Sequence, residues 1–220
     1  MSEVGFRALA ATLEQLDRDT YRELGADPLQ PVIGGGSADA AIALFGRDPG
    51  REEVRHQLPF VGAAGQKIRA AAYHHIHQRE MAGFADSLTM GEHFFWANTV
   101  PYKPIGNRAW SMAVKKEFHP LVADLLLRHW RGEAVITLGR EAFFWFGIGQ
   151  SRSDRAELER FWTSPDRFSN NIPVQLQGEE GRVRQLRLYP LPHPSPLNAL
   201  WYRRFPQLFA ARLQQLWPQG

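Results

Sequence analysis

The sequence contains a continuous apolar run at residues 40–45, Ala-Ala-Ile-Ala-Leu-Phe, between Asp39 and Gly46. An apolar run of this length without polar alternation is typical of a strand that is buried on both faces, as in a parallel sheet. Residues 94–100 (Phe-Phe-Trp-Ala-Asn-Thr-Val) and 134–139 (Ala-Val-Ile-Thr-Leu-Gly) show the same pattern. The three runs therefore predict three strands of one parallel sheet.

Segments with helical spacing separate these runs. Helices are expected at residues 1–25, 63–79, 110–130, 140–147 and 198–216. Gln66, Lys67 and Arg69 are expected to face solvent. Residues 174–188 alternate apolar and polar side chains around a Gly-Glu-Glu-Gly turn, which predicts a hairpin leading into the last core strand. Residues 151–171 are polar and expected to be irregular. The alternation of strands and helices favours an α/β/α sandwich.

The composition restricts the class of protein. A chain of 220 residues suits one sizeable domain, so we expect residues 1–220 to form a single domain, with 1–37 as an N-terminal helix and lead-in. The absence of cysteine excludes disulfides, thiolate zinc sites and cysteine-bound iron–sulfur clusters. No signal peptide is evident, and no stretch approaches the roughly 20 apolar residues of a membrane span. We expect no membrane partner.

Polar or aromatic groups follow the apolar runs in a fixed order. The four segments are residues 46–50 (Gly-Arg-Asp-Pro-Gly), 59–62 (Pro-Phe-Val-Gly), 98–101 (Asn-Thr-Val-Pro) and 193–197 (His-Pro-Ser-Pro-Leu). Ligands of parallel sheets bind beyond the carboxyl ends of the strands, where these segments are expected. They supply an acid, an aromatic platform, an amide and an imidazole. This set suits binding a flat heterocycle and breaking a bond next to it.

Each of these residues also has a simpler interpretation when it is taken alone. Asp48 is held rigidly beside Pro49, or it belongs to an ordinary turn. Phe60 stacks on a base, or it is a core side chain. Asn98 pairs with the edge of a pyrimidine, or it ties down its own loop. His193 donates a hydrogen bond to a carbonyl oxygen that gains charge, or it is structural.

Basic residues concentrate in the C-terminal third of the chain. Arg203 and Arg204 follow Trp201 and Tyr202, close to residues 193–197. Basic and aromatic side chains beside a site fit binding of a DNA backbone, to which Ser195 adds a donor. The net charge of +3 and the pI of about 9.4 lean mildly toward polyanions. The spacing of His74, His75 and His77 indicates a solvated helix surface rather than a metal site, so no metal is expected.

The four segments together resemble the uracil-DNA glycosylase superfamily, from about residue 38 to residue 213. Residues 98–108 are similar to the Asn-Val-Val-Lys-Cys-Arg-Pro-Pro-Gly-Asn-Arg stretch of the iron–sulfur glycosylases called family four. Residues 193–197 resemble the DNA-inserting loop of family one. Tyr102 stands where family four has a cysteine, and Asp48 stands where family one has its water-activating Asp. The chain thus looks like a family-four body that lacks the cluster and carries family-one-like residues.

The resemblance implies a central four-stranded parallel sheet between helices and a monomeric, cofactor-free, monofunctional uracil-DNA glycosylase. Such an enzyme flips uracil out of single- or double-stranded DNA, releases free uracil and leaves an abasic site, which implies a cytoplasmic role in DNA repair. The catalytic residues implied are Asp48 and His193. Uracil binding is implied for Arg47, Phe60 and Asn98, with Glu53 excluding the thymine methyl group. DNA contacts are implied for Gly65, Gln66, Ser195, Leu197, Arg203 and Arg204, with Leu197 as the wedge.

Other functions also fit the sequence. Gly50 stands where family one has a Tyr that crowds out thymine, which leaves room for another deaminated base such as hypoxanthine or xanthine. A binding protein that holds uracil or abasic sites and turns over slowly is the alternative from a different class. A nucleotide-binding protein fits less well, because Gly34, Gly35 and Gly36 precede their strand instead of following it.

Overall fold

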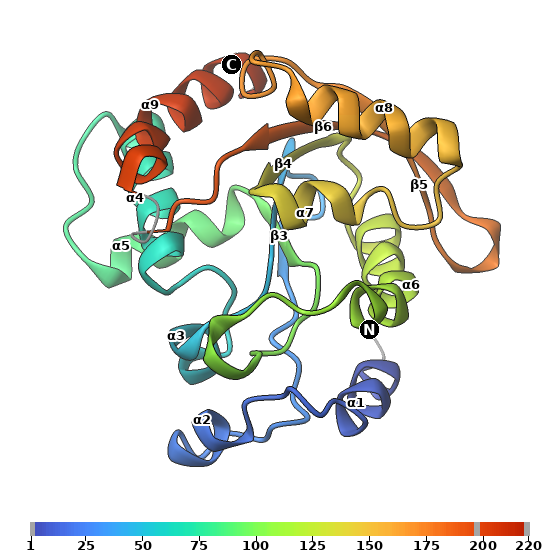
Figure 1. Cartoon of the computed structure of the whole chain (residues 1–220). Helices are drawn as coiled ribbons and strands as arrows, with labels where there is room; N and C mark the ends of the chain where they lie inside the picture. Colours follow the sequence, from blue (N-terminus) through green and yellow to red (C-terminus); the bar gives the residue numbers. More distant parts are fainter. Residues whose placement is uncertain (1–2, 196–198, 218–220) are drawn as a thin grey trace.

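The computed structural model describes residues 3–195 and 199–217. Within these ranges, six strands form one mixed sheet in the order β1-β3-β2-β4-β6-β5. The strands are β1 Gly35–Gly36, β2 Ile42–Gly46, β3 Phe95–Asn98, β4 Ala134–Leu138, β5 Ile172–Gln177 and β6 Val183–Leu191. Helices cover both faces of the sheet, which confirms the predicted α/β sandwich (Figure 1).

The four inner strands β3, β2, β4 and β6 run parallel, as predicted. The described sheet is nevertheless larger than the expected four strands, because an antiparallel strand is added at each edge. At one edge, β5 is the first arm of the predicted hairpin. At the other edge, β1 consists of two glycines with no apolar pattern to reveal it. A Cβ at the preceding Gly34 would lie 1.6 Å from the Trp96 carbonyl oxygen, so the close approach requires glycine there.

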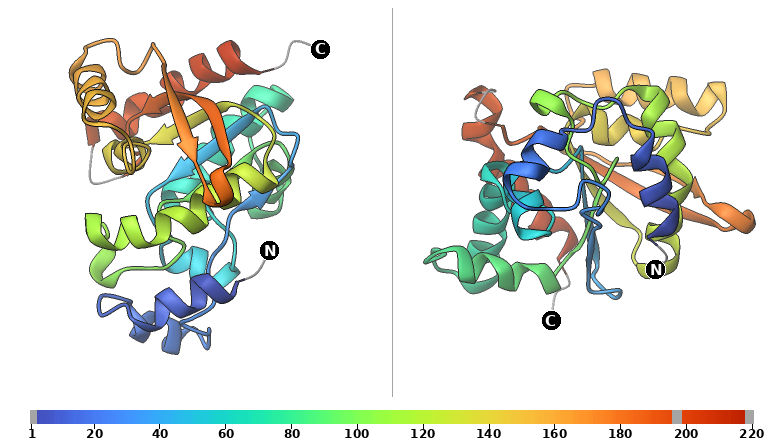
Figure 2. Two further views of the ribbon diagram at one scale, coloured as in Figure 1. Left: turned by 90° about the vertical axis from the view of Figure 1, so that its right-hand side faces the viewer. Right: turned by 90° about the horizontal axis from the view of Figure 1, so that it is seen from below.

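The strands alternate their side chains between two apolar cores. In β2, Ile42 and Leu44 enter one core, while Ala43 and Phe45 enter the other. Helices α4 Ala63–His77 and α9 Ala199–Leu216 cover the first core, and α6 Met112–His129, α7 Arg140–Trp145 and α8 Arg152–Thr163 cover the second (Figures 1 and 2). Burial on both faces explains why residues 42–45 of this run are apolar, whereas Ala41, before the strand, is exposed.

The remaining helices are short. They are α1 Val4–Ala11, α2 Arg18–Glu23, α3 Arg51–His56 and α5 Phe84–Thr89, with 3₁₀ turns η1 Met90–Glu92, η2 Ile105–Asn107 and η3 Glu179–Gly181. Helices α1 and α2 lie beyond the lower end of the sheet in Figure 1 and toward the viewer in the right-hand view of Figure 2. The single helix expected at the N-terminus is wrong, because Asp17 starts a second one by accepting the Thr20 backbone N–H at 3.1 Å.

The expectation that residues 151–171 are irregular is also wrong. Residues 152–163 form helix α8, which is capped by Ser151, whose hydroxyl accepts the Asp154 backbone N–H at 3.2 Å. Its polar residues face solvent, while Leu158 is buried and Phe161 and Trp162 pack against Phe143. A strongly charged helix with only a narrow apolar stripe is hard to distinguish from a loop by its composition.

None of the helices in the described residues is both long enough and apolar enough to cross a membrane.

Candidate active site

A cavity of about 570 Å³ opens where the parallel strands end. Its lining takes Gly46 and the residues after it from β2, Asn98 from β3, Leu138 and Gly139 from β4, and His193 from the chain after β6. The volume lies within the roughly 300–1,000 Å³ of typical ligand sites. Asp48, Phe60, Asn98 and His193, predicted from four separate segments, therefore share one cavity.

The Asp48 side chain is fully buried at the base of this cavity. Its Oδ2 accepts a hydrogen bond from Arg47 Nε at 2.7 Å, while its buried Oδ1 has no partner among the described residues. Burial raises the pKa of Asp48 to about 7; the positive charges of Arg47 and Lys115 oppose the shift and Glu141 adds to it. Burial thus brings the pKa of Asp48 close to neutral pH and leaves one carboxyl oxygen without a hydrogen-bond partner among the described residues.

His193 is held in its neutral form. Burial, aided by the positive charge of Arg47, lowers the pKa of His193 to about 4. Its Cβ lies 2.9 Å from the position that a Cβ on Gly139 would take, and Gly139 has φ of +90°. The glycine therefore lets the chain after β6 approach the end of β4. A neutral imidazole in this place is a hydrogen-bond donor without a formal charge.

Asn98 is the last residue of β3 and lies in register with Gly46 of β2. Its side chain is 7% exposed and lines the cavity. No other described residue makes a hydrogen bond to its amide. Since a buried amide without a partner is costly, Asn98 is suited to bind a ligand that offers both a donor and an acceptor.

Phe60 adopts an unusual backbone conformation, with φ of +57°. Its ring lines the cavity and packs against Trp96, with the ring centres 5.3 Å apart. Non-glycine residues at positive φ are uncommon and cluster at functional sites. Phe60 is thus both a member of the apolar core and a residue of the cavity wall, and its stacking role stays a prediction.

Arg69 holds the Phe60 loop in place. Its guanidinium donates to the carbonyl oxygens of Phe60 (2.8 Å), Ser87 (2.7 Å) and Pro59 (3.1 Å). It also lies 4.3 Å from the centre of the Trp96 ring. Arg69 is 3% exposed, so the expectation that it faces solvent is wrong. The burial of Arg69 could not be predicted from the sequence, because its hydrogen-bond partners are backbone carbonyl oxygens, which no residue type reveals.

Glu53 lies at the rim of the cavity, but its carboxylate is occupied by the protein itself. Oε1 accepts the backbone N–H groups of Val61 (2.9 Å) and Gly62 (2.6 Å), and Oε2 accepts that of Gly50 (2.9 Å). These bonds tie the loop after β2 to the entry of α4. The suggested role of Glu53 in excluding a methyl group stays a prediction, alongside this observed role in shaping the loop.

Gly65 lies in the first turn of α4 against the Phe60 backbone. We expect Gly65→Ala to destabilise the protein by about 1–3 kcal/mol, because the new Cβ would lie 2.1 Å from both the carbonyl carbon and oxygen of Phe60. Urea unfolding measures this change. Gly91→Ala is the matched control, since its Cβ would meet nothing within 4 Å. Equal stability of the two variants would contradict the close packing of Phe60 on α4.

The predicted DNA-contacting residues are spread more widely. Gly65 and Ser195 line the cavity. Gln66, Arg203 and Arg204 are not among its described lining residues. Gln66 is half-buried and donates to the Val61 carbonyl and the Ser87 hydroxyl, both at 3.1 Å, so its expected solvent exposure is only partial. Arg203 and Arg204 are exposed on α9. Leu197 lies outside the described residues.

Three residues that line the cavity were not predicted as site residues. Arg140 and Glu141 follow β4, and Asn107 closes the turn after β3. Glu141 forms an ion pair with the buried Lys115 of α6. The position of Arg140 and Glu141 directly after a predicted strand was a usable signal, because every strand end of a parallel sheet faces the same edge.

The residues at the place of the family-four cysteine do not fit an iron–sulfur cluster. Tyr102 is buried and its hydroxyl donates to the Leu29 carbonyl oxygen at 3.0 Å, and the chain contains no cysteine. Within residues 3–195 and 199–217, no group of His, Asp or Glu side chains is arranged to hold a metal ion.

The cavity at the carboxyl edge of the parallel sheet thus combines a buried acid, an amide, an aromatic ring and a neutral imidazole. The family model described as the uracil DNA glycosylase superfamily matches residues 33–217, and the chain belongs to this superfamily. DNA is therefore its substrate, and hydrolysis of a glycosidic bond is its reaction class. A search of curated proteins found no match.

Proposed function

We propose that the protein excises uracil from DNA by hydrolysing the N-glycosidic bond. The observation that carries this proposal is the meeting of Asp48, Phe60, Asn98 and His193 in one cavity at the carboxyl ends of the parallel strands. An acid after β2 and a neutral donor after β6 suit a bond that breaks between a sugar and a base. The amide and the ring suit recognition of a flat pyrimidine.

Asn98 would select the base. Its amide oxygen would accept the uracil N3–H, and its amide nitrogen would donate to O4. Cytosine has an acceptor at N3 and a donor at C4. The amide oxygen would then face an acceptor and the amide N–H would face a donor, so neither hydrogen bond could form. Phe60, fixed by Arg69, would stack on the base at about 1–3 kcal/mol per stacked base. Selectivity would thus come from hydrogen bonding and affinity from stacking.

The bond between C1′ and N1 would break with its electron pair leaving on uracil. His193 would donate a hydrogen bond to uracil O2 as this oxygen gains negative charge. The Asp48 carboxylate would stabilise the positive charge on the sugar and orient a water molecule. The water oxygen would bond to C1′, and one of its protons would pass to the Asp48 carboxylate, which lines the cavity.

DNA would lie across the mouth of the cavity. Ala63, Ala64 and Gly65 line the cavity from the first turn of the 15-residue helix α4, where backbone N–H groups favour a phosphate. Arg203 and Arg204 would meet the backbone beside it. Flipping the nucleotide out of the duplex costs a few kcal/mol in lost stacking and pairing. Leu197 would fill the space that the nucleotide leaves.

The rate is expected to depend on the ionisation of Asp48. Since the carboxylate is the active form, single-turnover uracil release should rise with pH through an apparent pKa near 7. His193, with its pKa near 4, should stay neutral and add no step above pH 5. A rate–pH series from pH 5 to 9 measures this profile. A rate that is flat across pH 6–8 would contradict the assignment of the acid.

A panel of oligonucleotides tests the substrate. Each would carry one uracil, hypoxanthine, xanthine, thymine or cytosine, in single strands and in duplexes, and would be scored for abasic sites. Uracil should be released at least about 100-fold faster than thymine or cytosine. Faster release of hypoxanthine or xanthine would identify another deaminated base as the substrate. The absence of a side chain at Gly50, which lines the cavity, favours this outcome.

A further inference from the structure

A short N-terminal segment is joined to the loop that follows β3. We call residues 15–17 the strap. Leu16 pairs with Pro104 as an isolated antiparallel bridge. On either side, the Ile105 N–H donates to the Gln15 carbonyl oxygen at 2.9 Å, and the Asp17 N–H donates to the Lys103 carbonyl oxygen at 3.1 Å. The strap therefore fixes the backbone of residues 103–105.

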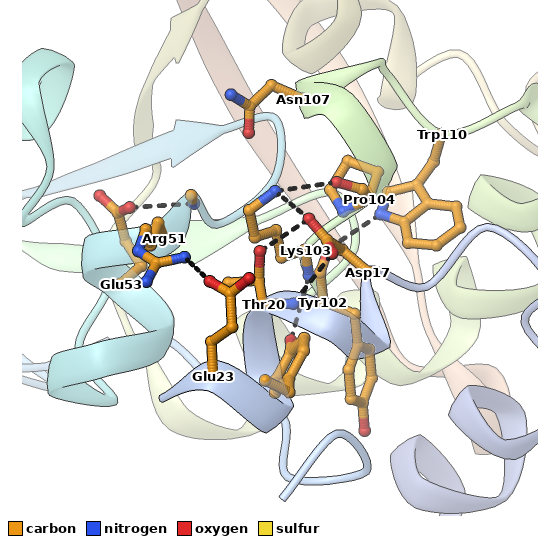
Figure 3. Close-up of polar contacts among 12 residues, drawn as sticks. Asp17, Thr20, Glu23, Arg51, Glu53, Tyr102, Lys103, Pro104, Asn107 and Trp110 are labelled. Atoms are coloured by element: carbon orange, nitrogen blue, oxygen red, sulfur yellow. Dashed lines mark hydrogen bonds and ion pairs between the residues drawn. The ribbon is translucent and has the colours of Figure 1, made fainter. Parts of the chain in front are cut away.

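A buried ion pair locks this contact. Lys103 is 4% exposed, and its ammonium donates to Asp17 Oδ2 at 2.7 Å and to the Pro104 carbonyl oxygen at 3.1 Å (Figure 3). The Lys103 backbone N–H donates to the Tyr21 hydroxyl at 3.2 Å. Removing one partner of a buried pair leaves an uncompensated charge, so the lock is sensitive to single substitutions.

The same loop reaches the cavity two residues later. Residues 105–107 turn through Gly106 (φ +62°) and Asn107 (φ +55°), which leaves the Asn107 carbonyl oxygen facing Arg47. Arg47 Nη2 donates to this oxygen at 2.7 Å, and Arg47 Nε donates to Asp48 Oδ2 at 2.7 Å. The Arg47 guanidinium thus connects the turn at residues 105–107 to Asp48. The position of the Asn107 carbonyl oxygen helps to fix the position of the guanidinium.

We propose that Asp17 and Lys103 are positioning residues for Asp48, acting through the turn at residues 105–107 and the Arg47 guanidinium. The catalytic part of this inference rests on the proposed function, whereas the structural part concerns only the Arg47–Asp48 contact. The other charged or titratable groups acting on Asp48 come from elements that the strap does not hold. They are Lys115 of α6 and Glu141 of α7. The neutral His193 lines the same cavity.

The test compares Asp17→Asn with Asp27→Asn. Asp27 belongs to the same N-terminal region and pairs with Arg7 at 2.8 Å, but this ion pair is half-exposed and does not lead to Arg47. The first measurement is the pKa of Asp48, followed by ¹³C NMR of the carboxyl groups and assigned with Asp48→Asn. It needs no DNA. Asp17→Asn should raise the Asp48 pKa, because the guanidinium that favours the carboxylate loses its support, and Asp27→Asn should leave it unchanged.

The second measurement is single-turnover uracil release at pH 6.5. On the acid limb, each unit by which the Asp48 pKa rises lowers the rate about tenfold. The loss should shrink as the pH rises above the new pKa, which a general loss of folded protein would not do. In an Arg47→Met background, Asp17→Asn should have no further effect on the rate, because the connecting guanidinium is already gone.

The outcomes separate the two proposals. An unchanged Asp48 pKa in folded Asp17→Asn, or full additivity with Arg47→Met, would overturn the positioning role. A raised pKa in a protein that releases no base would support the positioning and contradict the proposed function. If Asp17→Asn does not fold, Tyr21→Phe decides in the same assays, since it removes only the hydroxyl that accepts the Lys103 N–H. Tyr21→Phe should then raise the pKa of Asp48.

Discussion

Asp48→Asn is expected to lower the single-turnover rate of uracil release by about 10²–10⁴-fold, the range of a positioned acid or base. Asparagine keeps the shape of the side chain but can neither carry the negative charge opposite the sugar cation nor accept the proton of water. Because Asp48 is fully buried at the base of the cavity, the outer DNA-binding surface should be unaffected. Affinity for uracil-containing DNA should therefore stay within a few-fold.

The measurement pairs rapid-quench kinetics with a binding titration on the same oligonucleotide. Asp39→Asn is the control, since Asp39 lies just before β2 and is exposed in an ion pair with Arg131. It should change neither quantity. An unchanged rate in Asp48→Asn would remove Asp48 from the mechanism, and a parallel loss of rate and DNA affinity would give it a role in binding.

Asn98→Asp is expected to lower uracil release by at least about 100-fold, because the group that donates to O4 is lost. When its carboxyl group is protonated, it can donate to cytosine N3 and accept from the cytosine amino group. The variant should therefore lose most of its preference for uracil over cytosine. Ionisation of the new carboxyl group would also be costly, because it would be buried in the same cavity as the Asp48 carboxyl group.

Competition between uracil- and cytosine-containing duplexes in one reaction measures this preference directly. Thermal unfolding of the variant at the same pH separates loss of recognition from loss of fold. If Asn98→Asp retains the selectivity of the wild-type protein, another group recognises the base.

The parallel core was predictable because burial on both faces leaves a mark on composition. Strands β2, β3 and β4 are apolar at nearly every position, and the hairpin of β5 and β6 alternates as a half-exposed pair should. The edge strand β1 left no such mark, because two glycines carry no side chains. Helix α8 was missed because only one narrow stripe of it is buried.

The members of the site were predictable in the same uneven way. Asn98 ends a strand and Asp48 and His193 follow strands, and the parallel topology alone gathers these positions at one edge of the sheet. The contacts that set their chemistry were not predictable. Arg69 and Glu53 bind backbone groups, and the path from Asp17 to Arg47 joins segments 30 residues or more apart through a carbonyl oxygen. Such contacts depend on the three-dimensional placement of the chain and not on residue type.

Catalytic turnover is measured by a time course of uracil release, with uracil-containing duplex in at least about 20-fold excess over protein. We predict an initial release of one equivalent followed by continued release of free uracil, with abasic sites formed in equal amount. A plateau near one equivalent, whose height rises in proportion to the protein concentration, would instead indicate a protein that binds uracil or abasic DNA without turning over. Absence of any uracil release would show that uracil is not the base that the protein excises.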